Sequence, residues 1–242
     1  MFRLRIFLIT LLVTVGLILS ITGKGLAYPT LQLDIGGGSY DFSTETIVAA
    51  DNTFTLYAYL IQDNYNLLSD TYFISAAISP QISSGGADIG SFTFNGSTIN
   101  ATSDMTYGVP PLEDIASLQG WDSGDLPKHG IFPTYFSEFG FQFNSANQLA
   151  EYNTADRAIS GGSIPTSGTG MYYAAFTIDT SLLDPNYVIH FDLYNEKLKG
   201  LDVDVTHFAP FSHDAQSVPE PSTVLLLGSG LVGLWASRRF FV

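Results

Sequence analysis

Phe54-Thr-Leu-Tyr-Ala-Tyr-Leu-Ile61 alternates large apolar side chains with threonine and tyrosine. Because successive side chains of a β-strand point to opposite faces, the apolar set from Phe54 to Leu60 shares one face, while Tyr57 and Tyr59 share the other. The segment therefore predicts a strand with one dry face, buried in a core, and one wet face, exposed to solvent.

The same alternation recurs along the chain. It is clearest at residues 139–143, 187–193 and 201–205, and shorter strand signals lie at 31–35, 72–78 and 171–178. Helical periodicity is confined to single turns at 112–118 and 180–183. Each strand is expected to have a wet and a dry face, with the polar positions of 187–193, among them His190 and Asp192, on the wet one.

Asn95-Gly96 is the best local hairpin signal, because it stands between two alternating runs and accepts the positive φ angles of a type I′ turn. Together these signals predict an all-β fold, an antiparallel β-sandwich of jelly-roll or immunoglobulin-like type. Residues 28–217 are expected to form this single domain, with long loops at 100–136 and 146–170.

The chain has 242 residues, a formal net charge of −14 and no cysteine. The lack of cysteine excludes a disulfide scaffold and thiolate metal sites. Residues 28–217 hold 22 of the 23 acidic residues but only Lys128, Arg157, Lys197 and Lys199, so their net charge is 4 − 22 = −18. A surface this negative repels nucleic-acid phosphates, which excludes nucleic-acid binding.

Residues 1–27 have the layout of a secretory signal peptide. Met1-Phe-Arg-Leu-Arg5 is a basic start, residues 6–19 are apolar, and small residues precede the end at Ala27. Signal peptidase recognises such small residues, so we expect cleavage after Ala27 and export. An uncleaved N-terminal anchor is the alternative, because the apolar run approaches spanning length.

Residues 218–242 combine Pro219-Glu220-Pro221, an apolar stretch at 223–236 and the pair Arg238-Arg239. As a transmembrane helix the stretch would reach about 21 Å against the ~30 Å hydrocarbon core, a marginal span. Arginines directly after a span stay in the cytoplasm, which places the preceding domain outside. The alternative, a buried C-terminal helix, would show a polar face that this stretch lacks.

These three parts, in this order at the C-terminus, resemble the PEP-CTERM sorting signal of bacteria. The resemblance implies that an exosortase processes the chain near Pro219-Glu220-Pro221, and that the producing cell makes extracellular polysaccharide.

A second resemblance covers nearly all of residues 28–217. It concerns the choice-of-anchor N family, and it rests on Leu31-Gln-Leu-Asp-Ile35, Phe54-Thr-Leu-Tyr57, Gly124-Asp-Leu-Pro-Lys-His-Gly130, His190-Phe-Asp-Leu-Tyr194 and Phe208-Ala-Pro-Phe-Ser-His-Asp214. The family groups exported bacterial proteins with differing C-terminal sorting signals. It implies export and carries no activity.

Calcium is the possible cofactor, since it takes carboxylate and carbonyl oxygens from loops. Asp34 and Asp41 flank the glycines at 36–38, and Asp202 and Asp204 lie on one side of a strand. Solvated acids explain the same residues without an ion, and the chain has no EF-hand loop or calcium repeat. A cofactor is therefore not expected.

Zinc and a hydrolytic site are less favoured. The spacing of His207, His213 and Asp214 matches no zinc motif, and the strand pattern places His207 in a partly buried position. Residues 121–130 collect serine, aspartate and His129, but Gly-x-Ser-x-Gly is absent from residues 28–217. Trp121 in this polar loop is the candidate for stacking on a sugar ring.

These features predict a non-enzymatic protein of the extracellular polysaccharide matrix, adhesive or structural. Its expected partners are signal peptidase, exosortase, the membrane through the C-terminal helix, and possible extracellular polysaccharide. It is expected as an inner-membrane-anchored precursor and then at the cell surface or outside. The alternatives are a glycan-binding, lectin-like module that uses calcium, and a secreted hydrolase that uses His129 or His213.

Overall fold

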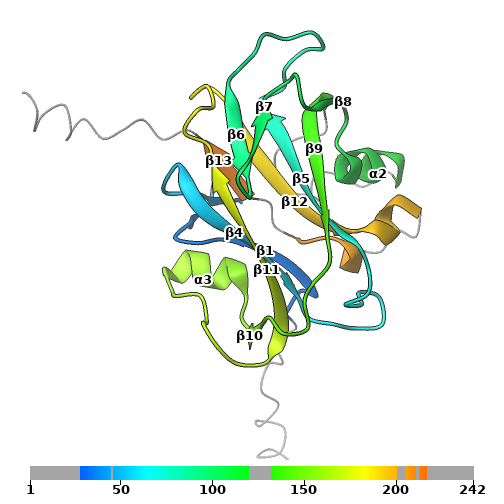
Figure 1. Ribbon diagram of the computed structural model, residues 1–242. Helices are drawn as coiled ribbons and strands as arrows, with labels where there is room; N and C mark the ends of the chain where they lie inside the picture. Colours follow the sequence, from blue (N-terminus) through cyan, green and yellow to red (C-terminus); the bar gives the residue numbers. More distant parts are fainter. Residues whose placement is uncertain (1–27, 45, 120–131, 201–204, 211–212, 217–242) are drawn as a thin grey trace, which may run out of the picture.

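The computed structural model describes residues 28–44, 46–119, 132–200, 205–210 and 213–216. They form two β-sheets that pack around one main apolar core (Figure 1). The predicted all-β sandwich in a single domain is confirmed.

The first sheet has the strand order β1-β4-β11-β6-β7, and β10 also pairs with β11. All of its pairs are antiparallel. Its strands are β1 (Leu31–Ile35), β4 (Thr53–Leu60), β6 (Ser91–Phe94), β7 (Ser97–Asn100), β10 (Gln148–Ala150) and β11 (Gly170–Asp179).

The second sheet has the order β2-β3-β13-β12-β5-β9-β8. Its pairs are antiparallel except that β13 runs parallel to β3. Its strands are β2 (Ser39–Asp41), β3 (Thr46–Val48), β5 (Tyr72–Ser79), β8 (Thr106–Gly108), β9 (Thr134–Phe141), β12 (Val188–Asn195) and β13 (His213–Gln216).

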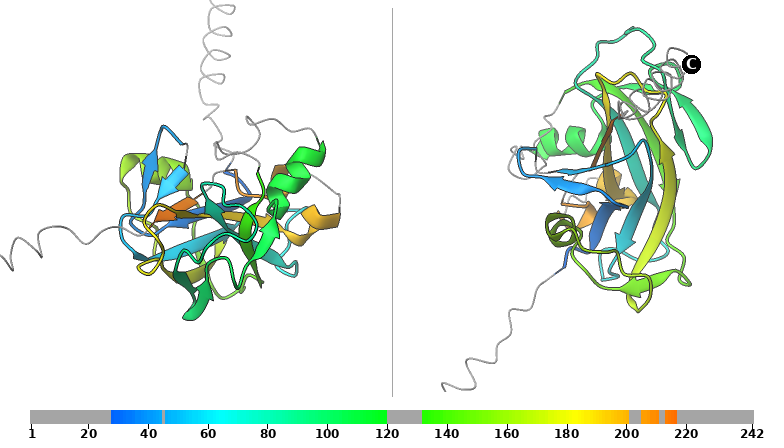
Figure 2. Two further views of the ribbon diagram at one scale, coloured as in Figure 1. Left: turned by 90° about the horizontal axis from the view of Figure 1, so that it is seen from above. Right: turned by 90° about the vertical axis from the view of Figure 1, so that its left-hand side faces the viewer.

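Within the described residues, four short helical segments flank the sheets. They are the α-helices α2 (Pro111–Gln119) and α3 (Thr154–Ser160) and the 3₁₀ helices η1 (Glu196–Gly200) and η2 (Val205–His207). Figure 2 shows α2 on the outer side of the second sheet, while α3 contacts β1 and β2, the edge strands of the two sheets. Each α-helix thus covers a part of the sandwich that would otherwise face water.

The core is built by the apolar positions of the alternating strands. Leu56 of β4, Ile74 of β5, and Phe191 and Leu193 of β12 are fully buried within it. Burying such side chains contributes about 1.5–3 kcal/mol each. The apolar side chains that alternate along each strand in the sequence are therefore the ones that pack between the two sheets.

The predicted hairpin is confirmed. Asn95 (φ 49°) and Gly96 (φ 78°) both adopt positive φ between β6 and β7, as a type I′ turn requires. The Asn95 side chain also accepts a hydrogen bond from the Thr177 amide at 2.9 Å, which ties the turn to β11.

The expectation of a wet face on every strand is wrong. All residues of β1 are buried, and so is β12 beyond Val188. Tyr59 of β4 is also buried, because Tyr152 packs edge-on against it and Leu149 of β10 joins the same cluster. Polar residues in these strands lie beneath other elements rather than in solvent.

The two expected long loops are only partly loops. Residues 100–136 contain β8, α2 and the start of β9, and residues 146–170 contain β10 and α3. The strand expected at 201–205 falls largely outside the described residues, and Val205 begins η2 instead. Among the described residues no helix is long and apolar enough to cross a membrane, and the span expected at 223–236 is not among them.

Candidate metal centre

β12 places a histidine and an aspartate side by side on its non-core side. Ile189, Phe191 and Leu193 point into the core, so the alternating His190 and Asp192 point away from it. Both side chains are nevertheless only 2–3% exposed. Two polar side chains so deeply buried need partners that replace water.

The partner from outside the sheet is α2. Leu112 and Ile115 pack with Tyr194, Leu198 and Phe208 in a small apolar cluster that seats this helix on the sheet. The seating buries Glu113, which is 1% exposed. The helix therefore delivers a carboxyl group to the side of β12 that carries His190.

Glu113, His190 and Asp192 meet in one cluster. One potential ligand atom from each lies within 4.8 Å of the other two. His190 Nε2 lies 3.3 Å from Asp192 Oδ1, while His190 Nδ1 lies 2.7 Å from Oδ1 of Asp214 on the neighbouring strand β13. The described members are thus three carboxyl groups around one imidazole.

The cluster retains protons in the absence of a metal ion. Burial, reinforced by the negative charge of Asp192, raises the pKa of Glu113 to about 8. Burial alone would lower the pKa of His190, but the carboxylates of Asp192 and Asp214 outweigh it and raise that pKa well above 6.5. At neutral pH, Glu113 is then neutral and His190 is charged.

A small pocket opens beside the cluster. Its lining includes Glu113, His190, Ser79, Phe132 and Thr134. Its volume is ≈ 10 Å³ for the centre of a water-sized molecule, room for about one water. A ligand at the cluster could therefore keep one water molecule in contact.

A second buried polar cluster joins α3 to β1. Arg157 donates a hydrogen bond to the carboxylate of Asp34 and pairs with it, and both side chains are buried. Tyr152 donates a further hydrogen bond to Asp34 at 2.9 Å. Burial raises the pKa of Asp34 to about 6 against the lowering effect of Arg157, so this carboxylate is charged at neutral pH.

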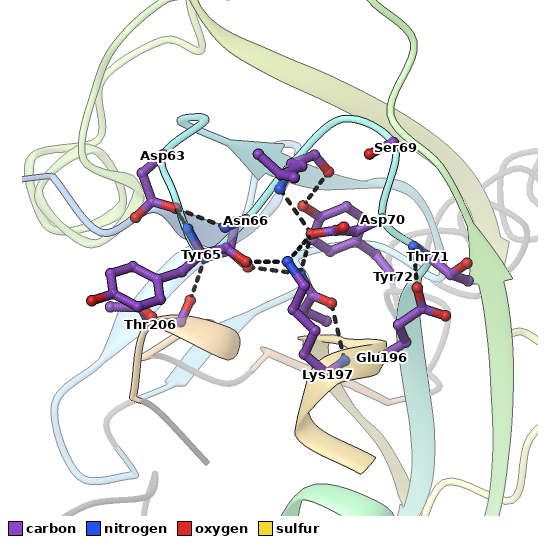
Figure 3. A network of polar contacts seen from close by, with 12 residues as sticks. Asp63, Tyr65, Asn66, Ser69, Asp70, Thr71, Tyr72, Glu196, Lys197 and Thr206 are labelled. Carbon is purple, nitrogen blue, oxygen red and sulfur yellow. Dashed lines mark hydrogen bonds and ion pairs between the residues drawn. The ribbon is translucent and has the colours of Figure 1, made fainter. Parts of the chain in front are cut away.

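The third polar network anchors the β4–β5 connection (Figure 3). Oδ2 of Asp70 accepts hydrogen bonds from the Leu67 amide, Asn195 Nδ2 and Lys197 Nζ at 2.7–2.9 Å. Asn195 also donates to the side chain of buried Asn66. Burial opposes a charged Asp70, but Lys197 outweighs it and lowers the pKa of Asp70. Lys197 neutralises the charge of Asp70 within this network. The hydrogen bonds of Asp70 hold the β4–β5 connection in place without a ligand.

The proposed calcium ligands do not gather in the described residues. Asp34 is buried with Arg157, whereas Asp41 lies in β2 and accepts hydrogen bonds from Ser43 at 2.7 and 2.8 Å. Asp202 and Asp204 lie outside the described residues. Calcium at these four positions stays a prediction.

The other candidate residues are also placed. Trp121 and His129 lie outside the described residues, as do Ala27 and the tail. His213 pairs in register with Phe191 and is fully buried, and burial lowers its pKa to about 3. It therefore sits on the core side of the sheet, away from His190, and its ring is neutral.

Sequence reasoning missed the cluster of Glu113, His190 and Asp192. Its available signal was the pair His190-x-Asp192 inside an apolar strand, which the alternation pattern assigned to solvent. Glu113 lies far away in the chain, and no local pattern connects it with β12.

The comparisons with known proteins concern the C-terminal tail. Residues 217–239 match the PEP-CTERM protein-sorting motif, and the match includes Pro219-Glu220-Pro221 and Arg238-Arg239. No curated protein and no solved structure gives a significant match to the chain. The matched motif is a signal for exosortase-dependent export and sorting to the cell surface.

Proposed function

We propose that residues 28–217 form a non-catalytic domain that acts in the extracellular polysaccharide matrix by adhesion or structural interaction. The observation that carries the proposal is the sorting motif at 217–239, because it directs the chain to the surface of the cell. In this proposal signal peptidase removes residues 1–27, and residues 223–236 hold the precursor in the inner membrane with Arg238 and Arg239 in the cytoplasm. Exosortase then cleaves near Pro219-Glu220-Pro221.

The described domain supports a structural role. Its two sheets share one large core, the charges of Asp34 and Arg157 balance one another, and Asp70 is hydrogen-bonded to Asn195 and Lys197. Groups already engaged with one another stabilise a shape and have little capacity left for catalysis. The assignment of residues 28–217 to the choice-of-anchor N family implies export alone, and it stays a prediction.

Deletion of residues 218–242 tests the sorting step. The truncated chain should leave the envelope fraction and appear in the medium, whereas Asp156→Asn, an exposed charge change in α3, should leave the distribution unchanged. Unchanged envelope retention of the truncated chain would contradict the proposed route.

The role in the matrix needs a separate measurement. Cells that lack the protein should form a matrix that disperses at lower shear, and the full chain should restore it while the truncated chain should not. Equal cohesion in all three strains would remove the matrix role and leave the sorting step standing.

Glycan binding is the second candidate, favoured by Trp121 as the single tryptophan of residues 28–217. A flat aromatic ring in a polar segment suits stacking on a sugar. Binding on a glycan array should be lost in Trp121→Ala and retained in Trp235→Ala, which changes the other tryptophan, in the tail. Loss of binding in chelator would show that binding requires calcium, and a glycan array without signal would exclude this candidate.

A further inference from the structure

We propose that Glu113, His190 and Asp192 bind one divalent first-row transition-metal ion of the Zn²⁺ or Mn²⁺ type. The ion would lie between α2 and β12. The proposal does not depend on the matrix role, because it concerns only these side chains.

The separations within the cluster fit a common ion. In a tetrahedral site with metal–ligand bonds of roughly 2.0–2.1 Å, neighbouring ligand atoms are about 3.3–3.4 Å apart. His190 Nε2 and Asp192 Oδ1 are 3.3 Å apart. A Glu113 oxygen falls within 4.8 Å of both, close enough for a side-chain adjustment to complete three ligands.

Asp214 orients the imidazole as metal sites require. Its Oδ1 lies 2.7 Å from His190 Nδ1, so the Nδ1–H donates to this carboxylate. The lone pair of the neutral ring then resides on Nε2, the nitrogen that faces Asp192. Metal-bound histidines almost always have such a carboxylate or carbonyl partner on the second nitrogen.

Ser75 gives a second, independent indication of a ligand. It is directly opposite Asp192 in the register of β5 and β12, and cross-strand partners project from the same face. Its side chain is fully buried, and its hydroxyl makes no hydrogen bond within the described residues. A buried hydroxyl without a partner destabilises the fold, and a metal-bound water or a fixed ligand carboxylate would satisfy it.

The donor set selects the class of ion. Two carboxylates and one imidazole suit Zn²⁺ and Mn²⁺, whereas Ca²⁺ takes oxygen ligands in larger numbers. Three protein ligands leave a coordination position open, and the pocket beside Glu113 and His190 has room for one water there.

The test uses the full chain, purified in mild detergent without a histidine tag and stripped with chelator. Zn²⁺, Mn²⁺ and Ca²⁺ are titrated separately by calorimetry, and bound metal is counted after gel filtration. The variants are Glu113→Gln, Asp192→Asn and Asp214→Asn. The matched control is Asp114→Asn, the same acid-to-amide substitution one residue along α2 at an exposed position.

We expect one tightly bound Zn²⁺ or Mn²⁺ per chain and weaker binding of Ca²⁺. Loss of the carboxylate that orients His190, in Asp214→Asn, should weaken binding about 10–100-fold, and loss of a ligand in Glu113→Gln or Asp192→Asn at least as much. Asp114→Asn should bind like the unaltered chain. Circular dichroism of each variant checks that it is folded.

Substitution by Cu²⁺ gives a readout that a folding defect would not imitate. Its electron paramagnetic resonance spectrum should show coupling to a single nitrogen, from His190. Absence of stoichiometric Zn²⁺ or Mn²⁺ binding to the folded chain would overturn the proposal. So would binding that Glu113→Gln and Asp192→Asn leave unchanged, or a copper spectrum without nitrogen coupling.

Discussion

The helices α2 and α3 each place one ionisable side chain against a buried aspartate of a strand, but α3 contributes a base and α2 contributes an acid. Each is short, and each lies over a buried acidic residue on the non-core side of a strand. From α3, Arg157 meets Asp34 of β1, whereas from α2, Glu113 meets Asp192 and His190 of β12. The first contact is neutral by itself, while the second adds an acid to an acid and needs a proton or a metal ion.

This difference assigns a structural role to the contact of Arg157 with Asp34 and a candidate functional role to the cluster of Glu113, His190 and Asp192. A paired buried charge is harmful only when its partner is removed. A cluster with several carboxyl groups around one histidine instead keeps a capacity for cations, because its carboxyl groups outnumber the cationic group among its described members. The raised pKa values of Glu113 and His190, each with a specific physical cause, also indicate a functional site.

The largest expected effect breaks the α3 contact. Arg157→Met should lower the free energy of unfolding by about 3–5 kcal/mol, because it leaves the buried carboxylate of Asp34 without its cation. Denaturant unfolding followed by fluorescence measures the change. The double variant Asp34→Asn/Arg157→Met should recover part of the loss, and a cost near zero for the single variant would show that the pair contributes little.

The pH dependence of the free energy of unfolding should distinguish the α2 contact from the α3 contact, because their acidic groups titrate over different pH ranges. In metal-free protein the folded chain holds a proton on Glu113 between pH 4.5 and about 8, while the unfolded chain does not. His190 acts in the same sense, since its contribution is complete below pH 6.5 and is lost as the pH rises through its raised pKa. Asp34 contributes a decline only between pH 3.8 and about 6. Below pH 6.5 the lowered pKa of His213 acts in the opposite sense, so stability should fall as the pH rises from 6.5 to 8, where of these groups only Glu113 and His190 act.

The slope is at most about 1.4 kcal/mol per pH unit for each group that is protonated in the folded chain only. The groups that face one another are Glu113 from α2, His190 and Asp192 from β12, and Asp214 from β13. Glu113→Gln should reduce the slope between pH 4.5 and about 8, whereas the decline that Asp34 contributes between pH 3.8 and about 6 should remain. Unfolding at a series of pH values measures both, and a stability that rises from pH 6.5 to 8 would contradict the assignment.

Much of the fold, but little of the site, follows from the sequence. Alternation in 54–61 predicts β4 and the core phase of Leu56, and Asn95-Gly96 predicts the β6–β7 turn, because these signals are local. The same alternation assigns His190 to solvent, since it records polarity and not what covers a strand. Burial of His190 involves α2, which lies far from β12 in the chain, so no local pattern can report it.

The missed helix α3 did leave a local signal. Asn153 caps its N-terminus by accepting a hydrogen bond from the Asp156 amide at 3.0 Å, and Gly161 ends it at φ 68°. Its seven residues are too few for apolar periodicity, so composition alone marks the segment as a loop. Its packing against β1 then depends on the long-range pair of Arg157 with Asp34.

Loss of that cap should have a smaller effect than loss of the ion pair. Asn153→Ala should lower the free energy of unfolding by about 1 kcal/mol, because the Asp156 amide loses its acceptor. Ser160→Ala is the comparison in the same unfolding experiment, because it removes one hydrogen bond, from the Ser160 hydroxyl to the Arg157 carbonyl, at the other end of α3. A loss as large as that of Arg157→Met would mean that the cap, and not the ion pair, holds α3 in place.

The smallest expected effect is that of Glu113→Gln on the metal-free protein. A protonated glutamic acid and a glutamine have nearly the same shape, and both can donate a hydrogen bond to the carboxylate of Asp192. Below the raised pKa of Glu113 the free energy of unfolding should therefore change by less than about 1 kcal/mol. The contrast with Arg157→Met follows from charge. Arg157→Met leaves the buried carboxylate of Asp34 without a cation, whereas Glu113→Gln replaces a neutral acid with a neutral amide. A severe loss for Glu113→Gln at pH 6 would mean that Glu113 is ionised there, and that its negative charge is already balanced within the folded chain.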